Sequence, residues 1–398
     1  MMKEKEEKRV PQLRFPEFTD DWEQRKLGEI ADKVSEKNKN NEFSEPFTNS
    51  AEQGIISQKE YFDREIVNNE NLNGYYIVKN DDFIYNPRIS VTAPVGPINR
   101  NRLGRNGVMS PLYTVFRTHD IDNLYLEFYF KTTKWHRFMK LNGDSGARFD
   151  RFTISSTQFM EMPIPYPTLD EQIKIGEYFD NLDHLITLHQ RKCNQAKKFK
   201  KYMLQKMFPQ NGEKNPEIRF GGFTDDWEQR KFSELVTIER GGSPRPIDKF
   251  ITNDENGLNW IKIGDAPEQG NYITQTAEKI RPEGLSKTRE VHPGDLILSN
   301  SMSFGRPYIM AIDGCIHDGW LAIRNTQKNF DLKFLCTLLG TDGMLNQYKA
   351  MAAGSTVNNL NKELVGGTTI AFPIMEEQIK IGGYFSNLDH LITLHQHK

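Results

Sequence analysis

The chain has 398 residues, of which 37% are hydrophobic and 27% charged, and its formal net charge at pH 7 is −2. Single hydrophobic cores stop growing at about 250–300 residues, so this length excludes a one-domain protein. No segment approaches the ~18 consecutive apolar residues of a membrane span, which excludes a transmembrane protein. Because the net charge is close to zero, nucleic-acid binding would have to depend on local basic patches.

Three cysteines, Cys193, Cys315 and Cys336, lie far apart in the sequence without CxxC or Cys/His spacing. This spacing argues against a disulfide framework and against a zinc site, so we expect buried free thiols. The N-terminal segment MMKEKEEKRV is charged and has no apolar run, so it is neither a secretory signal nor a membrane span. We therefore expect a cytoplasmic protein.

The peptide FTDDWEQRK occurs twice, at residues 18–26 and 223–231, which are 205 positions apart. A second, longer repeat is also present: EQIKIGEYFDNLDHLITLHQRK at 171–192 matches residues 377–398 at 19 of 22 positions. Repeats of this length indicate two tandem units. In the shorter repeat, Trp22 and Trp227 are expected to fill a packing site at a domain edge.

The repeats divide the chain into four parts. We predict a first variable domain with its leader over residues 1–167 and a first long helix over 168–212. A second variable domain follows over 213–373, and a second long helix over 374–398.

The two variable domains differ at most residue positions but share an arrangement of predicted strands and turns. DDFIYNPRIS (81–90) occupies the place of GDLILSNSMS (294–303), and GVMSPLYTVFR (107–117) occupies the place of GCIHDGWLAIR (314–324). Short β-branched and aromatic runs between Gly, Pro, Asn and Asp predict short strands joined by turns. We interpret the two domains as one fold that carries two different surfaces.

Helical patches are predicted near the end of each variable domain, at Leu124–Lys140 and Leu332–Tyr348. The segment INRNRLGRN (98–106) is longer than its counterpart in the second half and is expected to form an extended polar loop. The fold class is therefore α+β: two small irregular β-rich domains with short helices, separated by two long antiparallel coiled-coil helices with pseudo-two-fold symmetry.

From Leu169 to Phe208 apolar residues recur with alternating spacings of four and three, which is typical of a coiled-coil seam. Thr168 and Glu171 form a predicted capping box at the start of this helix. So long an exposed seam requires a partner helix, and the second copy is the expected partner. The residues assigned to this helix and subunit interface, with Trp22 and Trp227, are Ile175, Phe179, Leu182, Ile186, Ile381, Phe385, Leu388 and Ile392.

Residues 88–117 contain five arginines and no acidic residue, which predicts a local basic patch. Lys and Arg on phosphates supply DNA affinity, and Arg, Asn or Ser at base edges supply discrimination. A solvated surface loop is the alternative. The candidate DNA-binding residues of the first half are Ser50, Asn86, Arg88, Arg100, Arg102, Arg105, Ser110 and Arg148.

The second half is less basic, but its turns GGSPRP (241–246), SNSMSFGRP (299–307) and IHDGW (316–320) are rich in small polar residues. A His beside an Asp is more often a structural pair than a catalytic one, and no nucleophile is tied to it by sequence. The candidate DNA-binding residues here are Ser243, Arg245, Asn300, Ser301, Ser303, Arg306, His317 and Asp318.

Lysines crowd the C-terminal half of the first long helix. The helix dipole and a solvated face account for them without DNA, which is the preferred interpretation, and nucleic-acid contact is the alternative. These lysines are Lys192, Lys197, Lys198, Lys200, Lys201 and Lys206.

Catalytic motifs are missing. There is no GxxxxGK[ST] for ATP and no GxGxxG after a strand. YNPR (85–88) lacks the second proline and the aromatic residue of the Asn-Pro-Pro-aromatic methyltransferase motif, and PGDLILSN (293–300) lacks the Glu-x-Lys of a metal-dependent nuclease. The residues therefore predict a chain without catalytic or metal-binding residues.

The order LRFPEFTDDWEQRKLGEI, variable block, PIPYPTLDEQIKIGEYFDNLDHLITLHQRK, found twice, resembles the specificity subunit of type I restriction-modification systems over essentially the entire chain. WIKIGD (260–265) followed by HPGDLILSNSMSFGRP also resembles a common target-recognition domain of that family. The resemblance implies two target-recognition domains, each recognising one half of a bipartite site in double-stranded DNA. It also implies that the two conserved helices fix the spacer and dock two methyltransferase subunits, with two restriction (translocase) subunits outside.

The resemblance further implies that the assembled complex is an adenine-specific DNA methyltransferase and an ATP-dependent deoxyribonuclease. S-adenosylmethionine, ATP and Mg²⁺ would be bound by the partner subunits, and no cofactor by this chain. Two alternatives stay open: a coiled-coil scaffold that links two protein ligands, and a methyltransferase or nuclease in its own right.

Overall fold

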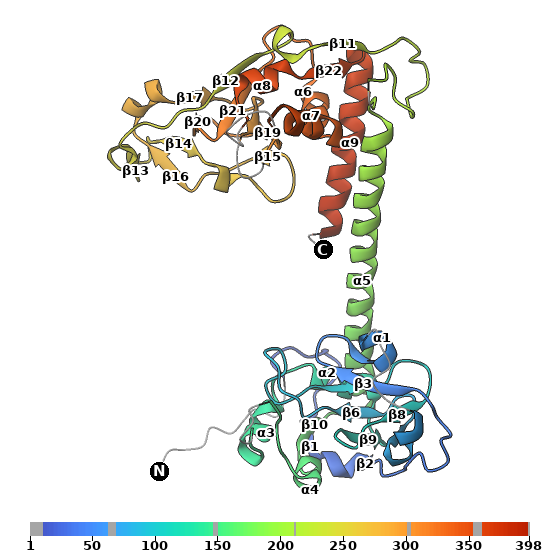
Figure 1. Cartoon of the computed structure of the whole chain (residues 1–398). Helices are drawn as coiled ribbons and strands as arrows, with labels where there is room; N and C mark the ends of the chain where they lie inside the picture. The colour runs from blue at the N-terminus through green and yellow to red at the C-terminus, as the bar shows by residue number, and fades with distance from the viewer. Residues whose placement is uncertain are drawn as a thin grey trace. The chain divides into compact units, whose positions relative to one another are not determined.

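The computed structural model describes residues 11–62, 69–145, 150–210, 212–300, 304–352 and 360–396. The chain folds as two compact units, Met1–Leu185 and Ile186–Lys398, and the boundary falls inside the long helix α5 (Leu169–Lys206) (Figure 1). Over these described ranges, each unit combines two β-sheets, a two-stranded ribbon and several short helices. None of the described helices is long and apolar enough to cross a membrane.

The first unit contains two four-stranded sheets. One is antiparallel, in the order β2 (Ala31–Lys33), β9 (Thr114–Thr118), β6 (Phe83–Tyr85) and β7 (Ile98–Arg100). The other has the order β4 (Gly54–Ser57), β3 (Pro46–Ser50), β8 (Gly107–Met109) and β5 (Tyr76–Val78), and its strands β3 and β8 are parallel.

The second unit contains two five-stranded sheets. The first has the order β12 (Thr237–Arg240), β21 (Trp320–Arg324), β18 (Leu296–Ser299), β19 (Pro307–Met310) and β15 (Tyr272–Ile273). The second has the order β13 (Ile251–Thr252), β16 (Glu278–Ile280), β14 (Leu258–Ile261), β20 (Gly314–Ile316) and β17 (Arg289–Val291), and its strands β14 and β20 are parallel.

Strand order confirms the predicted common plan. The series β2, β9, β6, β7 of the first unit corresponds to β12, β21, β18, β19 of the second, and both series are antiparallel. The other sheets share a parallel pair, β3–β8 and β14–β20, next to which β5 or β17 lies antiparallel. The two units therefore share one sheet plan although their letters differ.

The expected extended loop at residues 98–106 is wrong over its first three residues. Ile98–Arg100 forms strand β7, in which Ile98 pairs with Tyr85 and Arg100 with Phe83. Ile98 is buried and anchors the strand on the core. The polar residues around it hide the alternation of apolar and polar residues by which a half-buried strand is predicted from sequence. The rest of the segment, from residue 101, is a loop.

The short helices of the first unit are α1 (Gln58–Phe62), α2 (Asn123–Phe130), α3 (His136–Asn142) and α4 (Ser156–Met160). Those of the second are α6 (Leu332–Leu339), α7 (Asp342–Ala352) and α8 (Lys362–Gly367). The 3-10 turns are η1 (Leu27–Glu29), η2 (Asn69–Gly74), η3 (Phe232–Glu234), η4 (Ile247–Lys249), η5 (Ile263–Asp265) and η6 (Pro282–Lys287).

Each predicted helical patch is a pair of helices with a break. After α2, Thr132 Oγ1 donates a hydrogen bond to the Tyr129 carbonyl, and Trp135 Nε1 donates one to the Phe130 carbonyl. These side chains satisfy carbonyls that would otherwise need a further helical turn, so the helix ends there. Between α6 and α7 the chain breaks at Gly340, which follows the last residue of α6.

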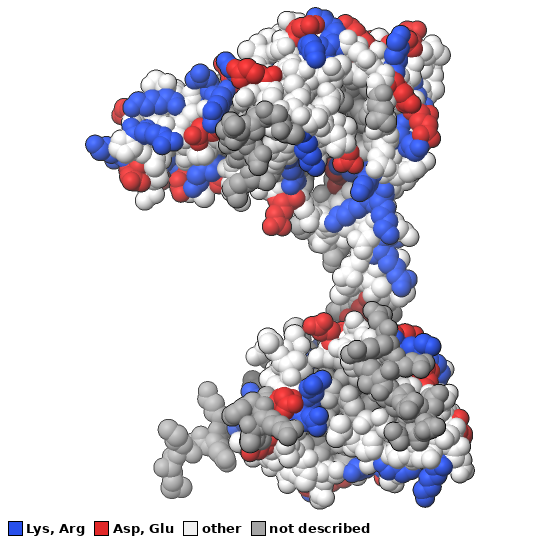
Figure 2. Space-filling view, in the orientation of Figure 1, with Lys and Arg blue, Asp and Glu red and all other residues white. Residues whose placement is uncertain are grey.

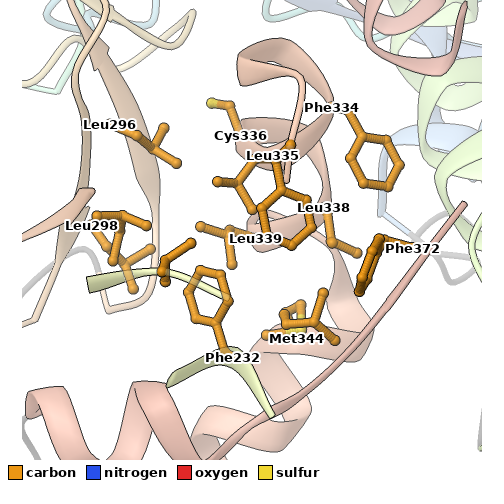
Figure 3. Packing of buried hydrophobic residues seen from close by; sticks show 14 of the residues in the cluster. Phe232, Leu296, Leu298, Phe334, Leu335, Cys336, Leu338, Leu339, Met344 and Phe372 are labelled. Carbon is orange, nitrogen blue, oxygen red and sulfur yellow. The ribbon is translucent and has the colours of Figure 1, made fainter. Parts of the chain in front are cut away.

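Each unit buries its own core. In the first, the rings of Phe83 and Phe116 stack with their centroids 5.5 Å apart, and Phe130 packs edge-on against both. In the second, helix α6 packs on the face of the sheet that contains β18. Figure 3 shows Leu296 and Leu298 on one side and Leu335 and Leu339 on the other.

The three cysteines are free and buried, as predicted. Cys336 lies in the core of the second unit, where burial raises the pKa of its thiol to about 12. Burial also raises the pKa of the Cys315 thiol. Both thiols are therefore packing residues that stay protonated at neutral pH.

The shorter repeat forms the same ribbon in both units. Strand β1 (Glu23–Lys26) pairs antiparallel with β10 (Pro163–Tyr166), and β11 (Glu228–Lys231) pairs in the same way with β22 (Thr369–Phe372). Trp227 is buried against Phe208 and Phe334, and half-buried Trp22 packs edge-on against Tyr125. The expectation that these tryptophans fill equivalent packing sites is confirmed.

The predicted capping box at the start of α5 forms only in part. The Glu171 N–H donates to Thr168 Oγ1 at 3.4 Å, but the Glu171 carboxylate accepts two hydrogen bonds from Arg14, at 2.7 and 2.8 Å. Glu377, at the start of α9 (Met375–Gln396), accepts the same two bonds from Arg219, at 2.7 and 2.8 Å. Each helix is therefore tied by a buried carboxylate to the segment that precedes the repeated nonapeptide.

Two further residues of the EQIKIG repeat, the glutamine and the glycine, position helices α2 and α6. Gln172 Oε1 accepts a hydrogen bond from the backbone N–H of Asp122, the N-cap of α2, and Gln378 accepts one from Asp331, the N-cap of α6. A Cβ on Gly382 would lie 2.6 Å from Asp331 Oδ1, so only glycine permits this close crossing, and Gly176 has the same role at α2.

Helices α5 and α9 pack together within the second unit. His189 Nδ1 lies 3.1 Å from His395 Nδ1, and Lys200 Nζ lies 2.5 Å from Asp389 Oδ1. Residue numbers rise along α5 as they fall along α9, so the helices are antiparallel, as predicted. The predicted seam residues of α9, all at most 9% exposed, are Ile381, Phe385, Leu388 and Ile392.

The same face of α5 in its N-terminal half is different. Ile175 packs on the core of the first unit, and Phe179 lies 5.3 Å from Phe128 with 43% of its surface exposed. Leu182 and Ile186 are 37% and 50% exposed. Within the described residues of the first unit this stretch contacts the short helix α2 at Phe179 and leaves Leu182 partly exposed, so the predicted continuous coiled-coil seam is wrong for it. Helix–helix packing begins near His189.

Candidate nucleic-acid interface

Asparagines join the ends of β3, β6 and β7 in the first unit. Asn86 Nδ2 donates a hydrogen bond to the Asn49 carbonyl at 2.8 Å, and Asn99 Nδ2 donates one to Asn49 Oδ1 at 2.6 Å. Asn49 is 2% exposed and donates from Nδ2 to the Ile84 carbonyl. Predicted site residue Asn86 therefore helps to shape the loop surface, and its Oδ1 is occupied by the backbone N–H of Arg88.

Two predicted serines lie in turns. Ser50 Oγ, at the end of β3, accepts hydrogen bonds from the backbone N–H groups of Glu52 and Gln53 at 3.3 Å. Ser110 Oγ, after β8, accepts one from Leu112 at 3.4 Å. Both hydroxyls hold the backbone of a turn, and each hydroxyl hydrogen is free to donate elsewhere. Their contact with DNA stays a prediction.

The arginines of the first half are held by acidic residues from other elements. Arg117 forms two hydrogen bonds to Asp82, at 2.7 and 2.8 Å, and Arg105 forms two to Glu45, both at 2.8 Å. The carboxylate of Asp82 is 1% exposed. Its hydrogen bonds hold the pKa of Arg117 above the ordinary value, and those of Arg105 hold the pKa of Glu45 below it.

The other two ion-paired arginines converge on Glu127 of α2. Arg102 Nε lies 2.8 Å from Glu127 Oε2, and its Nη1 lies 3.0 Å from Asp180. Arg100 is 15% exposed and contacts both Asp81 and Glu127. Residues 88–117 contain no acidic residue, but in the folded unit carboxylates from other segments neutralise four of their arginines. Among the arginines of this stretch that the structure describes, Arg88 is exposed without an ion pair.

In the second unit, Asp318 organises the GGSPRP loop. Ser243 Oγ donates to Asp318 Oδ1 at 3.0 Å, and His317 Nε2 donates to the same oxygen at 2.9 Å. His317 Nδ1 accepts the backbone N–H of Gly319 at 2.9 Å, which places the ring proton on Nε2. The His–Asp pair is therefore structural, as the sequence analysis expects, because both ring nitrogens have protein partners.

The double glycine of this loop permits its close approach to neighbouring backbone. A Cβ on Gly241 would lie 2.1 Å from the His317 carbonyl oxygen, and one on Gly242 would lie 2.4 Å from that of Lys287. The loop continues to Arg245, whose side chain is 82% exposed to solvent and whose Nη2 lies 3.8 Å from Asp318 Oδ2. Arg245 is thus an exposed cation on a fixed loop.

A hollow of about 800 Å³ brings together the predicted residues Ser243, Arg245 and His317. Its lining also includes Trp260 and the ion pair between Lys262 Nζ and Glu278 Oε1, which are 2.5 Å apart. Lys and Arg can donate to guanine, and Glu can accept from cytosine, so this lining has the chemistry of base discrimination. Lys262 and Glu278 are not among the site residues predicted from the sequence, although Lys262 lies within the WIKIGD motif.

The other candidates of the second unit are framework residues or lie outside the described residues. Asn300 is 3% exposed and donates from Nδ2 to the Asp318 carbonyl. Arg306 Nη2 donates to the carbonyls of Glu268 and Gly270, at 3.0 and 3.1 Å, so it fixes that loop. The candidates outside the described residues are Arg148, Ser301 and Ser303.

Two units with one sheet plan and unlike polar loops define a protein with tandem recognition domains. A family model for the type I restriction modification DNA specificity domain matches residues 19–198 and 224–398, so the chain belongs to that family of specificity subunits.

Curated relatives come from Methanocaldococcus jannaschii. The type I restriction enzyme MjaVIII specificity subunit is 22% identical over 306 residues, covering 73% of this chain and 70% of the relative. The putative MjaX specificity subunit is 24% identical over 247 residues, covering 61% of this chain and 56% of the relative.

Solved structures show the same fold at low identity. The HsdS subunit from Thermoanaerobacter tengcongensis aligns with a TM-score of 0.50 and 16% identity, over 94% of this chain and 91% of that one. The S subunit of a type I restriction-modification system from M. genitalium aligns with a TM-score of 0.55 and 12% identity, over 97% and 94%.

Proposed function

We propose that each unit recognises the bases of one half of a bipartite, asymmetric site in double-stranded DNA, and that the chain itself catalyses no reaction. The observation that carries this proposal is the shared strand order of the two units, whose loops differ in nearly every residue. Loops on a fixed scaffold can change their base contacts without changing the fold. Two different half-sites require two such loop sets.

The proposal includes partners for the repeated surfaces. The shorter repeat is identical in both units, and part of it is exposed in both, at Asp20, Asp21, Glu23, Gln24 and Lys26 and at Asp225, Asp226, Glu228, Gln229 and Lys231. Packing does not explain identity at exposed positions, whereas two copies of one partner do. We assign this partner as the methyltransferase subunit, with two restriction subunits joining outside.

The chemistry then belongs to the cytoplasmic complex. S-adenosylmethionine would be bound by the methyltransferase subunits, and ATP and Mg²⁺ by the restriction subunits. The complex would methylate adenine and cleave DNA in an ATP-dependent way. Among the described residues, no group of three or more His, Cys, Asp or Glu is arranged to hold a metal ion.

Domain exchange tests the two-reader proposal. The chain is purified with its methyltransferase subunit, residues 31–150 are replaced by the corresponding block of a related subunit, and methylated adenines are mapped. We expect one half of the site to change while the other half and the spacer stay the same. Exchange of residues 236–355 is the matched control and should change the other half. A change in both halves after either exchange would contradict the proposal.

The isolated chain tests the alternatives. Binding of S-adenosylmethionine, or Mg²⁺-dependent cleavage of DNA by the chain alone, would identify it as an enzyme. A DNA affinity no better than that of an acidic control protein, for the chain with its methyltransferase subunit, would favour a scaffold for two protein ligands.

A further inference from the structure

The part of α5 within the second unit is strongly basic. Residues 186–206 contain seven Lys or Arg and no Asp or Glu, in a chain whose net charge is −2. Figure 2 shows Lys and Arg side chains gathered along the exposed stretch of this helix. So dense a charge of one sign on one helix repels itself, which costs stability unless a ligand or partner neutralises it.

Two of these seven cations have acidic partners. Lys200 pairs with Asp389 at 2.5 Å, and Lys206 pairs with Glu217. Within the residues that the structure describes, the other five are exposed and have no acidic partner: Arg191, Lys192, Lys197, Lys198 and Lys201. The helix dipole acts only on the last turn, so it accounts for Lys206 but not for cations further from the helix end.

A hollow of about 320 Å³ lies beside this face. It opens between α5, α9 and the loop that Arg306 fixes through the carbonyls of Glu268 and Gly270. Its lining includes the donors Lys197, Lys201, Gln269 and Gln396, together with Lys200, which is paired with Asp389. Asp389 also lines it, but Lys200 neutralises that carboxylate. Several ammonium and amide donors around one hollow suit a phosphate, which accepts hydrogen bonds from many directions.

We propose that this hollow and the adjoining lysines of α5 bind phosphates of the DNA backbone outside the bases that the two units recognise. The inference rests on the proposed function, and it supplies the sequence-independent part of the affinity. Four of the five arginines in the first unit's stretch are used in ion pairs, so they are poor phosphate ligands. The unpaired cations of α5 provide the phosphate contacts for which those arginines are not available.

A double variant tests this proposal. Lys197→Gln with Lys201→Gln is made in the full chain, purified with its methyltransferase subunit, and binding to a duplex of random sequence is measured as a function of salt. Each phosphate contact contributes about 0.9 to the slope of log affinity against log salt, so the slope should fall by about 2. Lys333→Gln with Lys349→Gln, on exposed helix positions of α6 and α7, is the control and should leave the slope unchanged.

Backbone chemistry gives a second arm. Once the site is mapped, neutral methylphosphonate linkages are placed outside the bases of its two halves. They should weaken binding by the native complex and weaken the double variant much less. Base changes within a half-site must still weaken both proteins equally, and if they weaken neither, the proposed function itself fails while this inference is judged on the salt slope alone.

Two results would overturn the inference. The first is a native slope in the double variant, or an equal fall in the control. The second is a double variant that binds DNA with the native slope but no longer holds the methyltransferase subunit in size-exclusion chromatography. That second result would assign the lysine face to an acidic protein surface.

Discussion

Two stretches of this chain are rich in cations and free of acidic residues, and they behave differently in the fold. In residues 88–117 four of five arginines are paired with carboxylates from β-strand ends, α2 and α5. In residues 186–206 five of seven cations are exposed without an acidic partner among the described residues. Charge counted along a sequence window therefore does not predict surface charge, because neutralising residues come from elsewhere.

The largest expected effect on stability concerns the ion pair between Glu377 and Arg219, in which the carboxylate is completely buried. Glu377 is fully buried and holds Arg219, which is 15% exposed. We expect Glu377→Gln to lower the free energy of unfolding of the second unit by about 3–5 kcal/mol, because Arg219 would stay charged without its counter-ion. Glu376→Gln, at the exposed neighbouring position, is the control. Denaturant unfolding followed by tryptophan fluorescence measures both, and equal stabilities would contradict the pairing.

The next effect distinguishes a paired arginine from the unpaired one in the same stretch. Arg117→Gln should lower the free energy of unfolding of the first unit by about 1–3 kcal/mol, because buried Asp82 would lose its two charged hydrogen bonds. Arg88→Gln, on an exposed side chain, should change it by less than about 0.5 kcal/mol. Thermal unfolding of the two variants measures the difference. A larger loss for Arg88→Gln would break the comparison.

The pairing of Arg105 with Glu45 predicts a pH dependence. Arg105 lowers the pKa of Glu45 in the folded state, so the pair stabilises the fold above the unfolded-state pKa and loses this effect as pH falls through the folded-state pKa. Arg105→Gln should therefore cost less than about 1 kcal/mol at neutral pH, since both side chains are partly exposed. The cost should vanish in acid, where Glu45 is protonated. Urea unfolding at several pH values tests this, and a cost that does not change with pH would rule the pair out as its source.

The smallest expected effect on stability belongs to the unpaired lysines. Lys197→Gln with Lys201→Gln should change the free energy of unfolding by less than about 0.5 kcal/mol, or raise it slightly, because like charges four residues apart on a helix repel. The same variant should change the salt dependence of DNA binding. Loss of stability comparable to that of Arg117→Gln would mean that these lysines are structural after all.

The two copies of the long helix show what sequence identity leaves open. Phe179 and Phe385 occupy equivalent positions in repeats that match at 19 of 22 residues, yet Phe385 is fully buried and Phe179 is 43% exposed. The seam pattern predicts both as interface residues. It does not include the partner surface, which for Phe385 contains Phe208, two residues after the end of α5.

The candidate site was predictable in position but not in detail. The composition of the turns GGSPRP and IHDGW points to Ser243, Arg245 and His317, and the fold brings these three residues to one hollow. Lys262 directly follows β14 and Glu278 is the first residue of β16, so their proximity depends on the pairing of these strands, which the sequence does not reveal. The chemistry of Asn86 and Arg306 suits DNA, but the fold uses both side chains in hydrogen bonds to neighbouring loops.

The sequence by itself determined the duplication, the α+β class and the long helices, because repeats, hydrophobic periodicity and turn residues are local properties of a chain. Only the tertiary structure decided that the Glu171 carboxylate accepts its hydrogen bonds from Arg14 rather than from the Thr168 backbone N–H, that Ile98–Arg100 is a strand, and which cations are neutralised. Each of these outcomes depends on a partner far away in sequence. Electrostatic pairing and strand pairing act through space, so only the folded chain defines them.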